Sequence, residues 1–227
     1  MFDNYPNYDS INSDREREEK LMEDKRERCH KIGKLYSVLF WLTVLGTPII
    51  LVVSLVGGVV AGLLDSMELA YLVIGLISIL ALAAGVITTI VLFVLGKEES
   101  SFTAAGIAYI LLTLFNTASE FLPEGVIKKV AEVLGLIAAM FYLFKFINGS
   151  YYILAGVDNY LASQWESLKK VILYFIIGII ACVILVIIPI IRVIALIALV
   201  IAVFGAIVVL IWEWVLMFKT ARALKNF

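Results

Sequence analysis

The chain has 227 residues, of which 63% are apolar, and its mean hydropathy is +1.03. Soluble domains average roughly 45–50% apolar residues, so this composition excludes an ordinary soluble domain and predicts a membrane protein. The formal net charge of −1 leaves no excess of basic groups to neutralise phosphates, which argues against nucleic acid as a partner.

Residues 1–34 form a charged segment ahead of the first apolar run. Residues 1–13 are short, polar and turn-rich, and we expect them to be disordered. In the rest of the segment acids and bases alternate, and several opposite charges stand four residues apart, as Arg15 and Glu19 do. This spacing stabilises a solvated helix and predicts one that leads into the membrane.

The apolar runs predict an all-α, polytopic membrane helix bundle. A helix needs about 20 apolar residues to cross roughly 30 Å of hydrocarbon. Polar or Pro/Gly-containing breaks divide a transmembrane domain, residues 35–218, into six expected spans. The spans cover residues 36–64, 69–95, 102–121, 130–147, 171–188 and 193–218. Residues 219–227 are left as a short tail.

The apolar run from Val171 to Phe218 is too long for one crossing. Its 48 residues would make about 72 Å of helix, more than twice the hydrocarbon thickness. The run must therefore turn once, and Pro189 and Arg192 lie near its middle. Because proline lacks the N–H that continues a helix, we expect the turn there, with Arg192 anchored at the membrane surface.

Residues 150–170 have an amphipathic pattern. Apolar side chains such as Leu161, Trp165 and Leu168 fall on one helical face, and polar side chains such as Asp158 lie away from it. This pattern predicts one interfacial amphipathic helix between the fourth and fifth spans.

The distribution of lysine and arginine predicts the orientation. Six spans put both termini on one side of the membrane. With that side as the cytoplasm, fifteen cationic residues lie inside, and only Lys128, Lys129 and Arg192 lie outside. This bias predicts a multi-pass protein of the plasma membrane, which is the inner membrane in a bacterium, with cytoplasmic N- and C-termini.

Small residues recur every four positions in the first and last spans. These are Ser54, Gly58 and Gly62 in the first span and Ala198, Ala202 and Ala206 in the last. Small residues let membrane helices approach closely. They predict packing within the bundle or an interface with protein subunits or a second copy, and the pattern does not separate the two.

Polar side chains gather on one helical face of the third span. They are Tyr109, Thr113, Asn116, Thr117 and Glu120, and Lys128 and Glu132 follow across the next break. One interpretation is a polar vestibule that opens toward the outside, since a solute pathway needs such a face. The other is hydrogen bonding between helices or subunits.

Three further ionisable residues, Lys145, Arg192 and Glu213, lie inside spans or near their ends. Such groups are functional candidates by default because burying a charge in lipid is costly. Glu213 stands between two tryptophans near the inner end of the last span, which is typical of an interfacial anchor, and Lys145 is its candidate partner. Arg192, at the turn described above, is the third.

No catalytic or metal-binding pattern is visible. Cys29 and His30 are adjacent, so they point to different faces of a helix, and the chain has no phosphate-binding glycine loop or nucleophile elbow. We therefore expect no metal, no cofactor and no catalysis. The chain is expected to be a non-catalytic subunit, scaffold or assembly partner of a membrane complex. The alternative is a small-solute transporter or channel that uses the polar vestibule.

Overall fold

The computed structural model describes residues 8–63, 67–185, 188 and 192–227, which contain six helices and no strand. The helices are α1 (Tyr8–Leu63), α2 (Met67–Leu95), α3 (Ser100–Phe121), α4 (Val126–Leu154), α5 (Asn159–Leu185) and α6 (Arg192–Lys225). Within the described residues five of them, α2 to α6, are long and apolar enough to cross a membrane. The expected all-α membrane fold is confirmed at this level.

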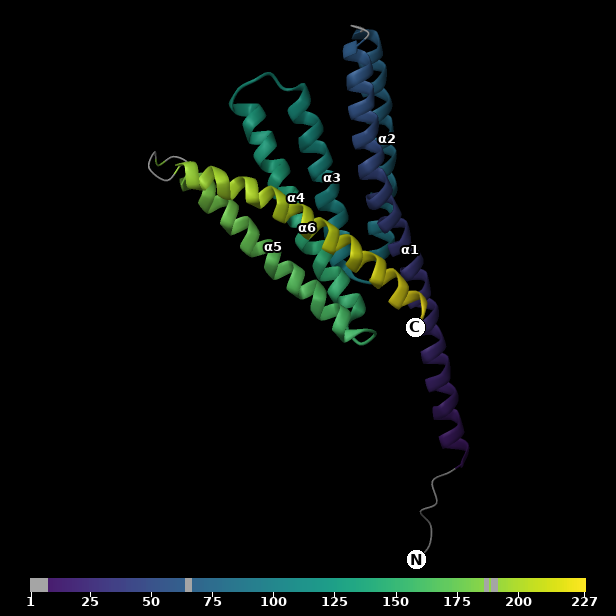
Figure 1. Cartoon of the computed structure of the whole chain (residues 1–227). Helices are drawn as coiled ribbons and strands as arrows, with labels where there is room; N and C mark the ends of the chain where they lie inside the picture. The colour runs from purple at the N-terminus through teal and green to yellow at the C-terminus, as the bar shows by residue number, and fades with distance from the viewer. Residues whose placement is uncertain (1–7, 64–66, 186–187, 189–191) are drawn as a thin grey trace, which may run out of the picture.

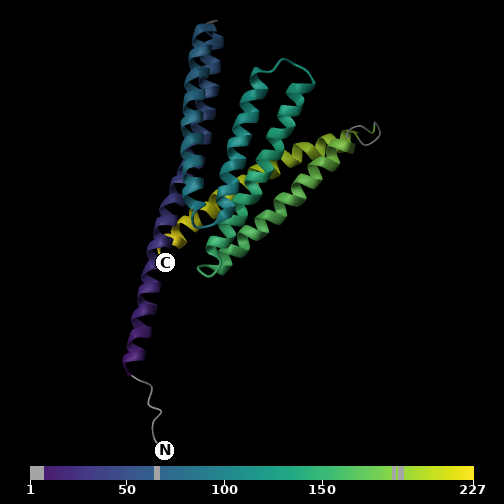
Figure 2. The same ribbon diagram turned by 180° about the vertical axis from the view of Figure 1, so that it is seen from behind.

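The helices form three antiparallel pairs that meet at one end of the molecule and diverge toward the other (Figures 1 and 2). The C-terminus and the turns at residues 96–99 and 155–158 lie where the pairs meet, which we call the charged end. The connection at residues 122–125 lies at the opposite, splayed end. Helix α1 also packs against α6, and it continues beyond the charged end as a single projecting helix (Figure 1).

The tightly packed core lies at the charged end and receives side chains from all six helices. Its fully buried members include Tyr36, Leu92, Phe102, Phe146, Trp165 and Leu216. Toward the splayed end, most of the large apolar side chains that the structure describes are exposed, which suits a surface in contact with lipid.

Small residues bring α3 and α4 together along most of their length. Ala131, Gly135 and Ala138 of α4 are all buried. A Cβ atom added at Gly135 would lie 2.7 Å from Oδ1 of Asn116 on α3, so the Asn116 side chain occupies the space that the glycine leaves. Close contact of small residues is the usual way in which membrane helices associate.

Helix α1 begins earlier than the sequence predicts. Residues 1–7 lie outside the described residues, but the chain is helical from Tyr8, so the disorder expected over residues 1–13 is not found from that residue onward. Extending an existing helix costs less free energy than nucleating a new one, which explains the added turn. The ion pair between Asp24 and Arg28, 3.2 Å apart, follows the spacing described above.

The separate interfacial helix expected over residues 150–170 is not confirmed. Residues up to Leu154 continue α4, and residues from Asn159 onward begin α5. In the turn between them Gly156 has a φ angle of +82°, which glycine adopts at little cost. The Asp158 carboxylate then accepts a hydrogen bond of 2.9 Å from the Leu161 N–H and caps α5.

The apolar face of this segment is buried against other helices. Leu161, Trp165 and Leu168 are 4%, 0% and 0% exposed. The amphipathic pattern indicated that these side chains leave water. Their partners are protein side chains, so the face does not lie on lipid headgroups.

The long apolar run is divided as its length predicts. Helix α5 ends at Leu185 and α6 begins at Arg192, so the run forms two helices. Pro189 lies outside the described residues. Arg192 is exposed at the first position of α6.

Gly149 provides a test of the packing at the charged end. A Cβ atom there would lie 2.7 Å from two ring carbons of the fully buried Phe102, which has no room to move. We expect Gly149→Ala to lower the free energy of unfolding by ~1–3 kcal/mol relative to its control, as overpacking does. The control is Gly178→Ala, because nothing lies within 4 Å of an added Cβ there.

Both variants gain the same helix propensity of about 1 kcal/mol, so the difference between them isolates the steric clash. Thermal unfolding of the purified protein in mild detergent measures it. Equal melting temperatures for the two variants would contradict the close packing of Gly149 on Phe102.

Candidate functional site

Phe146 on α4 is the centre of an aromatic cluster at the charged end. Its ring centroid lies 6.1 Å from that of Tyr36, 5.8 Å from that of Phe102 and 5.9 Å from that of Trp165. The contacts with Phe102 and Trp165 are edge-to-face, the geometry that aromatic pairs prefer. One side chain thereby joins α1, α3, α4 and α5.

The polar groups inside this cluster are all hydrogen-bonded. The Ser150 hydroxyl donates to the Phe146 carbonyl at 2.8 Å, so its remaining bond, 2.6 Å long, is accepted from the Tyr36 hydroxyl. The Trp165 Nε1–H donates to Thr220 Oγ1 at 2.9 Å and links α5 to α6. Among the described residues no buried side-chain nitrogen or oxygen lacks a partner. The cluster therefore holds helices together and leaves no buried polar group free for a reactant.

Two residues of the expected vestibule lie at contacts between helices. The Tyr109 ring packs against Tyr142 of α4, with centroids 5.3 Å apart, and its hydroxyl approaches Gly85 of α2. The Asn116 side chain lies against Gly135 of α4. These placements fit the interpretation of the polar face as hydrogen bonding and packing between helices.

The other vestibule residues lie apart from these contacts. Thr113 donates to the Tyr109 carbonyl of its own helix at 2.9 Å. Thr117, Glu120 and Glu132 are exposed, and Lys128 forms an ion pair with Glu124 one turn earlier. The structure brings Tyr109 and Asn116 to helix interfaces and does not gather the whole set around one space.

The three candidate charged residues are not brought together. Lys145 is half-buried, with Nζ 5.3 Å from the ring centroid of Phe141, a cation–π distance. Glu213 on α6 is also half-buried. The expected pair between Lys145 and Glu213 is not among the ion pairs of the described residues. Arg192 is exposed.

The small residues of the first and last spans lie partly outside the described residues. The side chains of Ser54, Gly58 and Gly62 lie outside the described residues. In α6, Ala198 and Ala202 are half-buried and Ala206 is exposed. The close approach is instead at the neighbouring Gly205, where an added Cβ would lie 2.8 Å from the Phe175 ring of α5.

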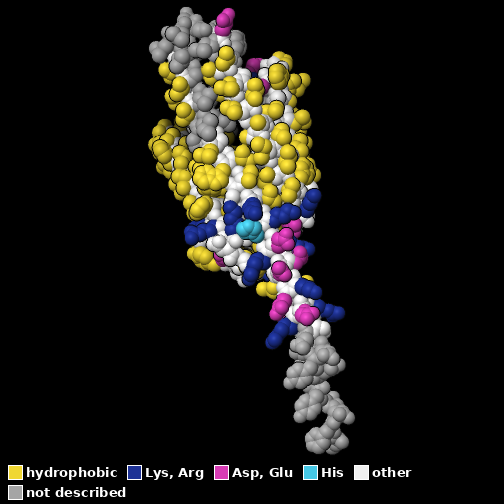
Figure 3. Space-filling view, turned by 90° about the vertical axis from the view of Figure 1, so that its right-hand side faces the viewer, with side chains coloured by type: hydrophobic (Ala, Val, Ile, Leu, Met, Phe, Trp, Pro, Cys, Tyr) yellow, Lys and Arg dark blue, Asp and Glu magenta, His cyan; other side chains and the backbone are white. Residues whose placement is uncertain are grey.

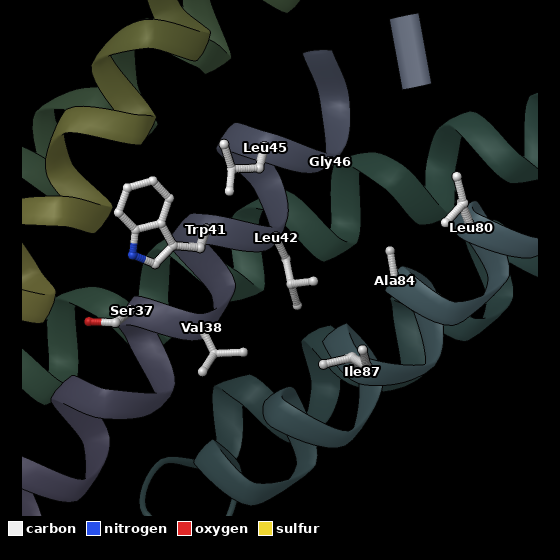
Figure 4. A pocket seen from close by; sticks show the side chains of 9 residues that line it. All are labelled: Ser37, Val38, Trp41, Leu42, Leu45, Gly46, Leu80, Ala84 and Ile87. Carbon is white, nitrogen blue, oxygen red and sulfur yellow. The ribbon is translucent and has the colours of Figure 1, made fainter. Parts of the chain in front are cut away.

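An apolar hollow of about 540 Å³ lies between α1 and α2. It is lined by Ser37, Val38, Trp41, Leu42, Leu45, Gly46, Leu80, Ala84 and Ile87 (Figure 4). The Ser37 hydroxyl donates to the Gly33 carbonyl of its own helix. The hollow therefore offers hydrocarbon contact and no group for chemistry.

A second hollow, of about 290 Å³, lies at the charged end, and we call it the polar hollow because six of its eight lining residues carry polar or charged side chains. It is lined by Asp158, Tyr160, Leu161, Gln164, Lys219, Arg222, Ala223 and Asn226. Figure 3 shows lysine and arginine side chains gathered at this level, where the hydrophobic surface gives way to the projecting helix. Neither hollow is lined by a residue of the expected vestibule.

The end of α6 is fastened to the charged part of α1. An added Cβ at Gly33 would lie 3.0 Å from the Ala221 carbonyl oxygen, so the two backbones nearly touch. The Arg26 Nε–H donates to the Phe227 carbonyl at 3.2 Å. Cys29 is buried beside these contacts, and burial raises the pKa of its thiol, so it stays protonated and structural.

Among the described residues no group of three or more His, Cys, Asp or Glu side chains is placed to hold a metal ion. Comparisons of the chain with protein-family models, with curated proteins and with solved structures found no match.

The hydrogen bond between Tyr36 and Ser150 predicts an asymmetry between two substitutions. Ser150→Ala leaves the buried Tyr36 hydroxyl without an acceptor, and we expect a loss of about 1–3 kcal/mol in the free energy of unfolding. Tyr36→Phe removes the donor itself and is expected to cost only about 1 kcal/mol. The exposed Ser167 bonds only its own helix, so Ser167→Ala is the matched control and is expected to be neutral.

Thermal unfolding in mild detergent measures all three variants. If Tyr36→Phe lowers the free energy of unfolding as much as Ser150→Ala does, or more, then the assignment of Tyr36 as donor and Ser150 as acceptor is wrong.

Proposed function

We propose that the protein is a non-catalytic subunit or assembly partner of a membrane complex. The observation that carries this proposal is the projecting part of α1. Every side chain described between Arg15 and Arg28 is exposed, including Leu21 and Met22 at 68% and 57%. Because this segment extends a helix that the core already holds, it can form without a partner, and its exposed apolar side chains are left for a protein partner to cover.

The surface within the membrane supports the same role. The helix pairs diverge toward the splayed end, and α5 and α6 carry exposed apolar side chains there, such as Val200 and Phe204. Diverging helices leave broad faces on which the spans of another subunit can pack. Assembly is a better match to these faces than binding of a small molecule in an enclosed space.

The proposal includes six spans, with α1 as the sixth. Its second half is apolar by sequence and lies beside α2 (Figure 1). Six crossings put both termini on one side, and the gathering of cations at the charged end supports the cytoplasm as that side (Figure 3). The host membrane is then the plasma membrane.

A small-solute transporter or channel is the alternative, and it has less support. A pathway needs polar groups that face one continuous space. The Tyr109 ring instead packs between helices, and Asn116, Thr117 and Glu120 are exposed on the surface.

Native mass and co-purification test the subunit role. The chain has a mass of 25.2 kDa, and extraction from its own host in mild detergent is expected to give a particle well above that mass plus its detergent. The double variant Leu21→Ser, Met22→Ser is expected to reduce co-purification, because it removes the apolar side chains of the projecting helix. The control Glu16→Gln changes an exposed side chain of the same helix and should leave the particle intact. Recovery of a bare monomer would contradict the proposal.

Cysteine labelling tests the topology. In a chain without its two native cysteines, Lys20→Cys and Glu98→Cys are expected to react with an impermeant maleimide only after the cytoplasmic side is opened. Glu124→Cys is expected to react in intact cells. Labelling of Lys20→Cys and Glu98→Cys from opposite sides would show that α1 does not cross.

A further inference from the structure

The polar hollow at the charged end has a fixed wall. Its lining comes from the first turns of α5 and the last turns of α6. The bond between Trp165 and Thr220 joins these two helices beside it, and Leu161 and Leu224 are buried below it. The two helix ends that carry the lining are therefore held in place by the core, while the side chains of Lys219 and Arg222 are exposed on them.

The hollow has two cations without a carboxylate partner. Lys219 and Arg222 stand three residues apart on α6, so they share one helical face. Neither takes part in an ion pair among the described residues. Arginine and lysine are the side chains that bind phosphate, arginine through two parallel hydrogen bonds.

Asp158 adds a negative charge to the same hollow. One of its carboxylate oxygens accepts the Leu161 N–H, and the other has no hydrogen bond within the described residues. A ligand with phosphate alone would pair with the two cations but leave this carboxylate unpaired, and a ligand with ammonium alone would pair with the carboxylate but leave the two cations unpaired. The lining is complementary to a ligand that carries both charges.

We propose that this hollow binds a zwitterionic ligand in which a phosphate is joined to a primary ammonium by a short chain. Lys219 and Arg222 hold the phosphate, and Asp158 accepts hydrogen bonds from the ammonium. The hollow has a volume of about 290 Å³, equal to roughly ten water molecules at ~30 Å³ each, which is enough room for a small ligand of this kind. Such a ligand is either the headgroup of an ethanolamine phospholipid or free ethanolamine phosphate. The level of the hollow, where the apolar surface ends, allows either source (Figure 3).

Native mass spectrometry of the full chain in detergent tests the site. Phosphatidylethanolamine, phosphatidylcholine and phosphatidylglycerol are added one at a time. We expect the ethanolamine lipid to bind most tightly, because a quaternary choline cannot donate a hydrogen bond to Asp158 and glycerol has no ammonium. The variant Lys219→Gln, Arg222→Gln is expected to bind it about tenfold more weakly, as loss of charge-assisted hydrogen bonds implies.

Matched variants keep the test specific. Lys97→Gln, Lys170→Gln removes two exposed cations that do not line the hollow, and it is expected to bind as the unmodified chain does. Asp158→Asn keeps an oxygen to cap α5 and is expected to lose the preference for ethanolamine over choline. Unchanged melting temperatures show that each variant is folded.

Two results would overturn the proposal. One is equal weakening of lipid binding by the Lys219/Arg222 variant and the Lys97/Lys170 variant. The other is equal binding of the three lipids to the unmodified chain. Displacement of the lipid by millimolar ethanolamine phosphate identifies the soluble ligand as sufficient. Retention of the lipid against this competitor identifies the bilayer as the source.

Discussion

The packing of the six helices depends on the cluster around Phe146. In lipid there is little hydrophobic force between helices, because lipid tails are as apolar as leucine. Shape and hydrogen bonding must therefore fix the arrangement. Phe146 supplies the shape through its contacts with Tyr36, Phe102 and Trp165. The hydrogen bonds donated by Tyr36 and Trp165 fix the relative orientation of the helices, because each joins a donor on one helix to an acceptor on another.

The position of this cluster determines what the rest of the molecule presents. Small residues such as Gly135 hold α3 to α4 beyond it, but the three helix pairs separate toward the splayed end (Figures 1 and 2). The faces left between them are apolar and belong to the membrane. At the other end the contact of Gly33 with Ala221 fixes the angle at which α1 projects. The charged end thus holds both the aromatic cluster and the exposed cations.

The lengths of the apolar runs and the breaks between them predicted where the helices lie. The spacing of polar and apolar residues predicted poorly which helices pack against each other. The break between Leu185 and Arg192 follows from the length of helix that fits a bilayer, which depends on no other part of the chain. The pattern over residues 150–170 showed that Trp165 avoids water. It did not show whether the side chain is buried against lipid or against protein, because both are apolar. In the same way the face of α3 was visible in the sequence, whereas its contact with Gly135 depends on how α4 is placed. Tyr36 and Ser150 were missed because 114 positions separate them.

The last turns of α6 combine contacts on which both proposals rest. Their inner face holds Thr220 against Trp165, and Ala221 lies against α1. Their outer face carries Lys219 and Arg222 into the polar hollow. A ligand that restrains the outer face also restrains the inner one, because a single helix carries both. By thermodynamic linkage, any effect of that ligand on a partner bound to α1 is matched by an equal effect of the partner on the ligand. If both proposals hold, helix α6 is the element that would couple the ligand in the polar hollow to a partner on the projecting helix.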